Sequence, residues 1–344
     1  MRLLVLGGTA WVSGLVADLA VQRGHAVTAL ARGESGQAPP GVRLVHSDRT
    51  LPEPYAGLTG EWDAVVDVTR HPGQLRSATV ALAGRTAYLA FVSTCSVYAD
   101  DSTPGADESA AVHPPLAGEV MESMEDYGPA KVACEEAALA GFGADRTLIA
   151  RPGLIAGPGD WSGRSGYWPW RFANPATDDG AVVVPHSPTL ATQLIDARDL
   201  AAWLLDCCER RAPGLANACG DLVALPDHLS VARDVAGHRG PVLGAEPDWL
   251  AAQGIQPWMG PRSMPLWLPL PEYAGFAARS VAAARALGLR SRPLAETLAD
   301  TLAWESARRT ARPELPWSAG LTDGQAAELV TALRKARPTD SVHG

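Results

Sequence analysis

Residues 3–15 read LLVLGGTAWVSGL, and this short stretch decides the fold. A run of four apolar residues breaks into glycines and then resumes with the spacing of a helix. A dinucleotide-binding turn needs a tight reversal after a strand and a helix whose positive end faces the pyrophosphate. Gly7 and Gly8 supply the reversal, whereas the small residues Ala10 and Ser13 stand where later glycines are expected. The stretch predicts a cofactor loop, with an ordinary strand, turn and helix as the alternative.

Short β-branched runs alternate with helical patterns along the first half of the chain. The runs are apolar at nearly every position, which is typical of parallel strands covered on both faces. The predicted strands are LLVLGG at 3–8, AVTALARG at 26–33, VRLVHSD at 42–48, WDAVVDVT at 62–69 and AYLAFVST at 87–94, with a helix at 12–24. We therefore expect an α/β fold built on a Rossmann-type, doubly wound parallel sheet.

The composition of the sequence changes after about residue 155, where Gly, Pro and Trp become frequent and no clear periodicity is present. A smaller, irregular lobe lying over the carboxyl edge of the sheet is expected there, because ligands of such folds bind at that edge. The predicted division is a dinucleotide-binding Rossmann domain at 1–155, to which 190–215 return, a mixed substrate-binding lobe at 156–189 and 216–336, and a flexible tail at 337–344.

Composition excludes several classes of function for this chain of 344 residues. A formal net charge of -9 disfavours nucleic acid and anionic membrane surfaces as partners, and no apolar run is long enough to predict a membrane span. An N-terminal signal peptide is disfavoured because Gly7 cuts the apolar run. The five cysteines show no metal-binding spacing, so no metal site is predicted and reduced thiols in the cytoplasm are expected.

The ends of the second and third predicted strands suggest which dinucleotide is preferred. NAD-binding sites place a carboxylate after the second strand for the ribose 2′-OH, whereas a 2′-phosphate needs a cation with no acid nearby. Arg32 follows Ala31 at this point, which favours NADP, with NAD as the second choice. An arginine that only solvates a loop is the alternative. Asp48, at the end of the third strand, is a candidate acceptor for the adenine amino group.

The sequence YGPAK at 127–131 places a phenol and an ammonium on one face of a helix. A tyrosine with its usual pKa near 10 is a poor proton donor and acceptor at neutral pH, and a neighbouring cation lowers that pKa. Lys131 is such a cation for Tyr127 and is also placed to hold the nicotinamide ribose. Thr94, at the end of the fifth strand, supplies a hydroxyl for the substrate oxygen. Pro129 requires the helix to begin near Tyr127 or to kink.

With these motifs the chain resembles the extended short-chain dehydrogenase/reductases, which include nucleotide-sugar epimerases and dehydratases. The matching segments are VLGGTAWVSG, VSTCSVY, YGPAK, RPGLIAGPG at 151–159, QLIDARDLA at 193–201 and PLAETLADTLAW, so the resemblance covers most of the chain. It implies that Thr94, Tyr127 and Lys131 are catalytic. It also implies cofactor contacts from Gly7, Gly8, Thr9, Ala10, Trp11, Val12, Arg32, Asp48, Asp67, Val68, Thr69, Lys131, Pro152, Gly153, Leu154 and Ile155.

The chain departs from the family pattern at positions that bear on the reaction. Ala10 and Ser13 replace two glycines of the turn. The family's sugar dehydratases carry an Asp-Glu pair after the active threonine, whereas Cys95 and Ser96 follow Thr94 here, so dehydration lacks its carboxylates. Many nucleotide-sugar enzymes carry an asparagine that corresponds to Leu154, so a nucleotide-sugar substrate is disfavoured.

These observations predict an enzyme, an NADPH-dependent oxidoreductase that reduces a carbonyl of a small, partly apolar metabolite. The tryptophans of the lobe are candidates for an apolar pocket wall, or for packing that only joins the lobe together. Two alternatives stay open: a nucleotide-sugar 4-epimerase with tightly bound NAD, and a non-catalytic dinucleotide sensor or RNA-binding relative. By analogy with the family, a homodimer formed through helices of the sheet domain is expected.

Overall fold

The computed structural model describes residues 1–312 and 319–336, which form two compact units. The first unit comprises Met1–Ile155, Ile195–Asp221 and Gly275–Ser291. The second comprises Ala156–Leu194, Leu222–Ala274 and the described residues from Arg292 onward. The tail predicted at 337–344 lies outside the described residues. The functional roles expected of the two units stay predictions.

The first unit is built on one seven-stranded parallel sheet with the strand order β11-β6-β5-β4-β1-β2-β3. The order reverses between β1 and β4, which is the switch point beside which ligands of doubly wound sheets bind. The Rossmann-type fold predicted from the alternating runs is therefore confirmed. The strands are β1 (Arg2–Leu6), β2 (Ala26–Ala31), β3 (Arg43–His46), β4 (Ala64–Asp67), β5 (Leu89–Val92), β6 (Thr147–Pro152) and β11 (Gly214–Ala218).

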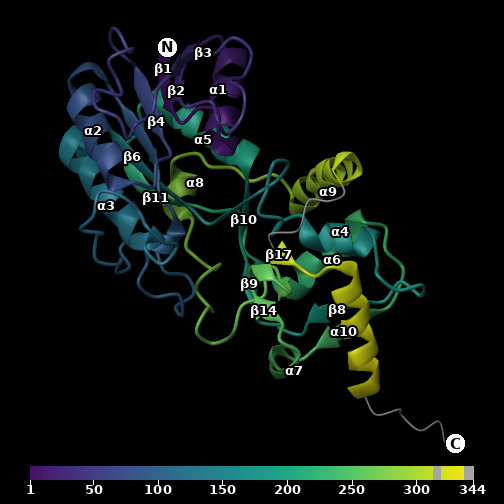
Figure 1. Ribbon diagram of the computed structural model, residues 1–344. Helices are drawn as coiled ribbons and strands as arrows, with labels where there is room; N and C mark the ends of the chain where they lie inside the picture. Colours follow the sequence, from purple (N-terminus) through teal and green to yellow (C-terminus); the bar gives the residue numbers. More distant parts are fainter. Residues whose placement is uncertain (313–318, 337–344) are drawn as a thin grey trace, which may run out of the picture. The chain divides into compact units, whose positions relative to one another are not determined.

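Helices cover both faces of this sheet because successive strand residues point to opposite sides. Leu3 and Val5 pack on the side of α1 (Trp11–Gln22) and α5 (Ala197–Arg210). Leu4 and Leu6 pack on the other side, with α2 (Pro72–Leu82) and α3 (Tyr127–Phe142). Figure 1 shows α2 and α3 to the left of the sheet and α1 and α5 to its right. The β-branched and leucine-rich runs thus form two apolar layers, one on each face.

Shorter elements complete the first unit. They are the 3-10 helices η1 (Ala83–Arg85), η2 (Cys95–Val97) and η3 (Ala144–Arg146), the short helix α8 (Ala282–Ala286), and β7 (Leu154–Ala156) and β10 (Leu194–Asp196), where the chain leaves and re-enters the unit. The segment Gly275–Ser291, which the sequence-based division placed in the lobe, packs within this unit. Gly275 N–H donates to the Asp101 carbonyl at 2.7 Å, and the Arg279 guanidinium pairs with the Asp101 carboxylate at 2.7 Å.

The second unit combines helices with four two-stranded ladders, β12-β9, β13-β8, β14-β16 and β15-β17. Its helices are α4 (Tyr167–Ala173), α6 (Leu225–Val235), α7 (Pro247–Ala252), α9 (Leu294–Ala311) and α10 (Asp323–Ala336). Its strands are β8 (Val182–Pro185), β9 (Ala191–Thr192), β12 (Val223–Ala224), β13 (Val242–Ala245), β14 (Gln256–Pro257), β15 (Gly260–Pro261), β16 (Ser263–Met264) and β17 (Ala319–Gly320). None of the helices in the described ranges is long and apolar enough to cross a membrane.

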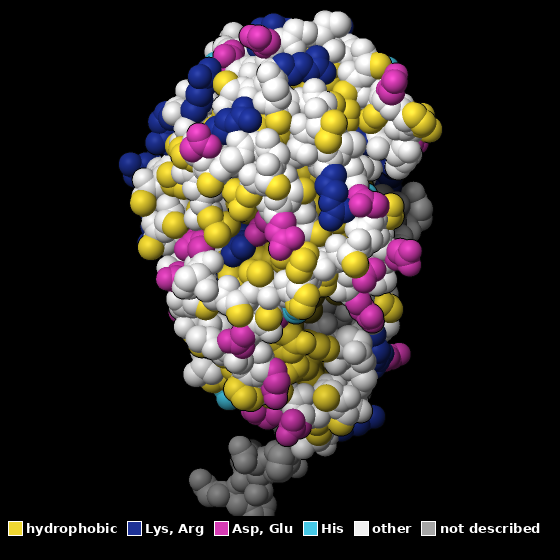
Figure 2. Space-filling view, turned by 90° about the vertical axis from the view of Figure 1, so that its left-hand side faces the viewer, with side chains coloured by type: hydrophobic (Ala, Val, Ile, Leu, Met, Phe, Trp, Pro, Cys, Tyr) yellow, Lys and Arg dark blue, Asp and Glu magenta, His cyan; other side chains and the backbone are white. Residues whose placement is uncertain are grey.

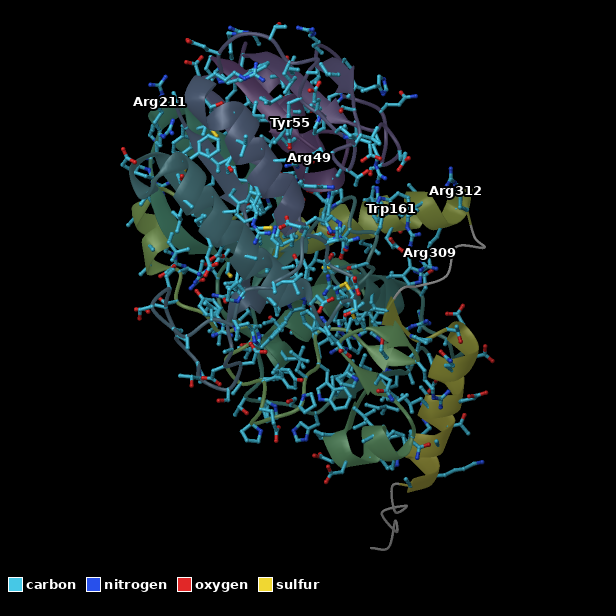
Figure 3. The ribbon with its side chains drawn as sticks, turned by 60° about the vertical axis from the view of Figure 1, so that its left-hand side comes forward. Arg49, Tyr55, Trp161, Arg211, Arg309 and Arg312 are labelled. Atoms are coloured by element: carbon cyan, nitrogen blue, oxygen red, sulfur yellow. The ribbon has the colours of Figure 1, made fainter. Side chains whose placement is uncertain are left out.

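Tryptophan side chains have different roles within the second unit. Trp168 is fully buried and its indole N–H donates to the Pro265 carbonyl at 2.7 Å, so it serves as packing. Trp161 remains 59% exposed and meets the Trp304 ring edge-on at 5.4 Å between ring centroids. The Arg308 guanidinium lies over the Trp161 ring, 5.4 Å from its centroid, and Figure 3 labels Trp161 on this unit. Of these two tryptophans, only Trp161 offers exposed surface to a ligand.

Candidate active site

The turn after β1 depends on both of its glycines. Gly7 has a φ of 82°, a conformation that favours glycine, and its N–H donates to the Leu30 carbonyl at 2.8 Å. A Cβ atom on Gly8 would lie 2.7 Å from the Ala29 Cβ, so a larger residue would push the turn away from β2. The tight reversal and close packing expected of a cofactor loop are therefore present.

The two non-glycine residues of the turn are accommodated without loss of close packing. The Ser13 hydroxyl donates to the Gly7 carbonyl at 2.6 Å and is almost completely buried, so it braces the turn from inside. Ala10 precedes α1 and provides no side-chain cap, and the first turn of α1 contains no acidic residue. The positive end of α1 is therefore not neutralised by a carboxylate of its own first turn, which suits an anionic group.

The polar residues after β2 and β3 form a mixed-charge cluster. Arg32 is exposed and pairs with Glu34 at 3.1 Å, also exposed. The Asp48 carboxylate accepts from Thr50 N–H at 2.9 Å and from its hydroxyl at 2.8 Å, and these hydrogen bonds, with the nearby Arg32 charge, lower the Asp48 pKa. The interpretation of Arg32 as a 2′-phosphate ligand overlooked Glu34, an acid that is readable two residues farther along the sequence.

Asp67, at the end of β4, is fully buried in an ion pair with Arg49. Two Arg49 nitrogens donate to its two carboxylate oxygens at 2.9 and 2.7 Å, and Thr69 N–H donates to the same carboxylate at 2.9 Å. Arg49 also donates to the Tyr55 hydroxyl at 3.0 Å, and Figure 3 shows the two side chains together. Arg49 was missed because no sequence motif contains it. Its structural role is to neutralise Asp67 beside the predicted cofactor contacts Val68 and Thr69.

The remaining predicted cofactor contacts lie around the switch point and at the end of β6. Thr9 follows the glycine turn, and Trp11 and Val12 begin α1. The Val68 side chain lies 3.4 Å from the position of a Cβ on Gly7, so β1 and β4 meet closely at their carboxyl ends. Pro152 ends β6 and is buried, whereas Gly153, Leu154 and Ile155 are partly exposed.

Helix α3 begins at Tyr127, as the position of Pro129 required. Gly128, in the first turn, packs against the loop that follows β5. A Cβ atom on Gly128 would lie 2.3 Å from the Ser96 carbonyl oxygen and 3.1 Å from Cδ2 of His113. Only glycine therefore lets the start of α3 approach the segment that carries Thr94, and His113 from a neighbouring loop completes this contact.

Lys131 is buried at the carboxyl ends of two adjacent strands. Its ammonium donates to the Thr69 carbonyl at 2.7 Å and to the Val92 carbonyl at 2.5 Å, and it lies 4.4 Å from the centroid of the Phe91 ring. Burial lowers the pKa of Lys131 to about 8, and the nearby groups Cys134, Asp67 and Glu135 oppose that shift. The cation is thus held beside the predicted cofactor segment at 67–69.

The Thr94 hydroxyl lies at the end of β5 and is oriented by its own loop. It accepts a hydrogen bond from Ser96 N–H at 3.1 Å and donates to the Ser96 hydroxyl at 3.2 Å. Thr94, Tyr127 and Lys131 therefore come from a strand end and from the first turns of one helix that packs on it. The structure contains no group of three or more His, Cys, Asp or Glu placed to hold a metal within residues 1–312 and 319–336.

Comparison with known proteins shows which solved structures share this fold. No family model matches the sequence. A structure assigned as an epimerase from Burkholderia cenocepacia J2315 is 22% identical with a TM-score of 0.65, over 89% of this chain and 98% of that one. A structure of UDP-galactose 4-epimerase is 18% identical with a TM-score of 0.61, over 90% of this chain and 99% of that one. A structure of UDP-glucuronic acid 4-epimerase from Bacillus cereus, in complex with NAD, is 13% identical with a TM-score of 0.62, over 90% of this chain and 99% of that one.

One curated protein provides a sequence match rather than a likeness of fold. The 2'-dehydrokanamycin reductase of Streptomyces kanamyceticus is 32% identical over 161 residues, which are 45% of this chain and 43% of the reductase. The match therefore spans less than half of either protein. The resemblance noted in the sequence is confirmed by these relatives: the chain has the fold of the NAD-dependent epimerases and dehydratases of the extended short-chain dehydrogenase/reductase family.

Proposed function

We propose that this protein is an NADPH-dependent oxidoreductase that reduces a carbonyl group of a small, partly apolar metabolite. The observation that carries the proposal is the placement of Lys131, whose ammonium is bound to carbonyls at the ends of β4 and β5 and lies one helical turn from Tyr127. A buried cation near a phenol favours the phenolate and so lowers the phenol pKa. With Lys131 four residues farther along the same helix, Tyr127 is our candidate for the proton donor near neutral pH.

The residues of the first unit suit a dinucleotide. Gly8 leaves no room for a Cβ beside β2, and the first turn of α1 carries no carboxylate that would repel a pyrophosphate. A reduced nicotinamide, when bound, supplies the hydride. Tyr127 gives its phenolic proton to the carbonyl oxygen, and the Thr94 hydroxyl turns from Ser96 to donate a hydrogen bond to that oxygen. Lys131 stabilises the phenolate left on Tyr127 and provides a donor for ribose hydroxyls.

The sequence match and the residues after Thr94 both support reduction. Part of the chain is related to a reductase, so 2'-dehydrokanamycin is the first carbonyl compound to assay. Cys95 and Ser96 provide no carboxylate for the removal of water, which disfavours a dehydratase. The exposed Trp161 and the buried Trp168 are consistent with a partly apolar second unit.

Oxidation of NADPH in the presence of 2'-dehydrokanamycin and a panel of smaller ketones tests the proposal directly. The wild type is expected to turn over at least one of them. Tyr127→Phe should lose turnover while the dissociation constant for NADPH stays within about threefold, because the phenol contributes its proton only in the chemical step. Wild-type turnover that persists in Tyr127→Phe would refute the mechanism.

A 4-epimerase with tightly bound NAD is the second candidate. The Arg32–Glu34 pair favours it, because a carboxylate after β2 suits the ribose 2′-OH of NAD. Protein that releases NAD on denaturation and interconverts UDP-glucose and UDP-galactose would support this candidate. Non-catalytic RNA binding is disfavoured by the net charge of -9, and salt-sensitive retention of RNA on a filter would reverse that judgement.

The preference for NADP over NAD depends on Arg32. A thermal-shift titration with NADPH, NADP, NADH and NAD side by side measures it, because each bound dinucleotide raises the melting temperature by mass action. Arg32→Ala should weaken NADPH binding and leave NADH binding unchanged if Arg32 turns from Glu34 to a 2′-phosphate. Equal losses for both cofactors would contradict this role of Arg32.

We also propose that two copies pair through α2 and α3. The helices pack closely, since a Cβ on Gly141 would lie 2.4 Å from the Thr79 Cβ, and both leave apolar side chains exposed, Val80 at 89% and Leu139 at 42%. Figure 2, which brings the side of Figure 1 with these helices toward the viewer, shows apolar side chains scattered among charged ones. Light scattering on the wild type and on Val80→Arg tests this, and a monomeric wild type would contradict it.

All five cysteines are buried and unpaired, which supports our proposal that the protein works in the reducing cytoplasm.

A further inference from the structure

A third polar side chain projects from the face of α3 that carries Tyr127 and Lys131. Glu135 follows Lys131 by four residues, as Lys131 follows Tyr127, so all three lie along one side of the helix. Lys131 is 2% exposed and Glu135 is 6% exposed. The proposed reaction uses the first two residues and leaves a buried carboxylate unexplained.

Successive turns of α3 hold successive residues at the end of β5. The Lys131 ammonium donates to the Val92 carbonyl at 2.5 Å, and the Ser93 hydroxyl donates to Glu135 Oε1, also at 2.5 Å. The next residue along the chain is Thr94, which precedes η2. The position of the Thr94 hydroxyl therefore depends on two contacts with the helix that carries its catalytic partners.

Arg151, at the end of β6, fixes the orientation of the Glu135 carboxylate. Its Nε donates to Oε1 at 2.9 Å and its Nη2 donates to Oε2 at 2.6 Å, so the two planar groups meet side by side. Both side chains are at least nine-tenths buried, and a further Arg151 nitrogen donates to the Tyr98 hydroxyl at 3.0 Å. The two arginine contacts hold the carboxylate in the orientation in which Oε1 accepts from the Ser93 hydroxyl.

We propose that Glu135 is a positioning residue of the reductase site: oriented by Arg151, its carboxylate holds Ser93 and thereby keeps the Thr94 hydroxyl in place relative to Tyr127 and Lys131. This inference rests on the proposed function, because it assigns Glu135 a role in the same reaction. The contacts of the Glu135 carboxylate are with Ser93 and Arg151, so it acts on Thr94 through Ser93.

The charge of Glu135 has a second effect on the site. The charged and titratable groups that face Lys131 are Asp67 on β4, Arg70 in the loop that follows, and Cys134 and Glu135 on α3. Burial lowers the pKa of Lys131, and the negative charge of Glu135 opposes that shift. Removal of this charge should make Lys131 lose its proton at a lower pH than in the wild type.

Two substitutions separate the contact from the charge. Ser93→Ala removes the hydrogen bond that the Ser93 hydroxyl donates to Glu135 and leaves the Glu135–Arg151 ion pair intact, so the protein should fold. Glu135→Gln removes the charge at nearly constant volume. Glu305→Gln is a matched control, since Glu305 in the second unit is also a buried carboxylate held by two arginines, Arg308 and Arg309.

The measurements are kcat, KM and the pH dependence of kcat with NADPH and the best carbonyl substrate. Ser93→Ala should lower kcat about tenfold, with KM unchanged and the same basic limb of the pH profile. Glu135→Gln should lower kcat by more and move the basic limb to lower pH. Glu305→Gln should lower thermal stability and leave kcat within about twofold. Unchanged kcat in both Ser93→Ala and Glu135→Gln would overturn the proposal, as would an unmoved basic limb in Glu135→Gln.

Crystal structures of the wild type and Glu135→Gln distinguish failure of this inference from failure of the proposed function. If the wild type reduces no carbonyl, the proposed function fails. The role of Glu135 is then judged by comparing the positions of Thr94 and Lys131 in the two crystal structures. A displaced Thr94 side chain in the variant would support positioning even then. Thr94 and Lys131 in their wild-type positions would refute it, whatever the activity.

Discussion

Gly128 offers the sharpest test of how the candidate site is assembled. In Gly128→Ala the new Cβ would lie 2.3 Å from the Ser96 carbonyl oxygen, about 1 Å inside an ordinary carbon–oxygen contact. Because the oxygen belongs to the backbone, either the start of α3 or the loop after β5 must move. We expect a shift of about 1 Å between the segment that carries Thr94 and the helix turn that carries Tyr127.

Two opposing terms set the cost in stability. Overpacking lowers the free energy of unfolding by about 1–3 kcal/mol. Replacing glycine by alanine within a helix raises it by about 1 kcal/mol. The expected net loss is about 0–2 kcal/mol in the free energy of unfolding, measured by denaturant titration. The expected loss of activity is larger, because a misplacement of about 1 Å costs about 100-fold in rate.

Two other glycines serve as controls. A Cβ on Gly141, toward the far end of α3, would lie 2.4 Å from the Thr79 Cβ, so Gly141→Ala should lose similar stability with kcat changed less than about threefold. Gly324, in α10, has nothing within 4 Å of its Cβ position, so Gly324→Ala should leave stability unchanged or slightly raised. Equal activity losses in Gly128→Ala and Gly141→Ala would refute the proposed role of the Gly128 contact.

Three further predictions concern charge and the cofactor turn. Because burial lowers the pKa of Lys131 to about 8, the folded protein binds fewer protons than the unfolded chain between about pH 8 and 10.5. Unfolding titrations should therefore show the wild type gaining stability relative to Lys131→Met as the pH rises through that window. Over the same range, kcat should fall above about pH 8. Arg49→Met leaves the Asp67 carboxylate buried and unpaired and should cost about 3–5 kcal/mol by urea titration, of which Arg49→Met with Asp67→Asn recovers a part. Ser13→Ala removes the hydroxyl that donates a hydrogen bond to the Gly7 carbonyl, which should lower the free energy of unfolding by about 1 kcal/mol. It should also weaken dinucleotide binding in a thermal-shift assay. Unchanged binding would show that the turn keeps its conformation without this hydrogen bond.

The features predicted correctly from the sequence are those determined by local pattern. Apolar runs such as that of β1 identify buried parallel strands, and Pro129 indicates where α3 begins. Contacts between distant segments are not encoded in any local pattern. The Arg49–Asp67 pair joins residues 18 positions apart, and the hydrogen bond from Ser93 to Glu135 joins residues 42 positions apart. The return of Gly275–Ser291 to the first unit was missed for the same reason, since it depends on pairing with Asp101.

The first unit is assembled from three separate stretches of the chain, and this has a consequence for synthesis on the ribosome. Strand β6 is complete at Pro152, but its neighbour β11 does not begin until Gly214, about sixty residues later in translation. Until then the nascent polypeptide presents an open, apolar sheet edge to other chains. Ribosome stalling or truncation between these two strands should therefore yield aggregated fragments, and chaperone demand should be greatest in that interval.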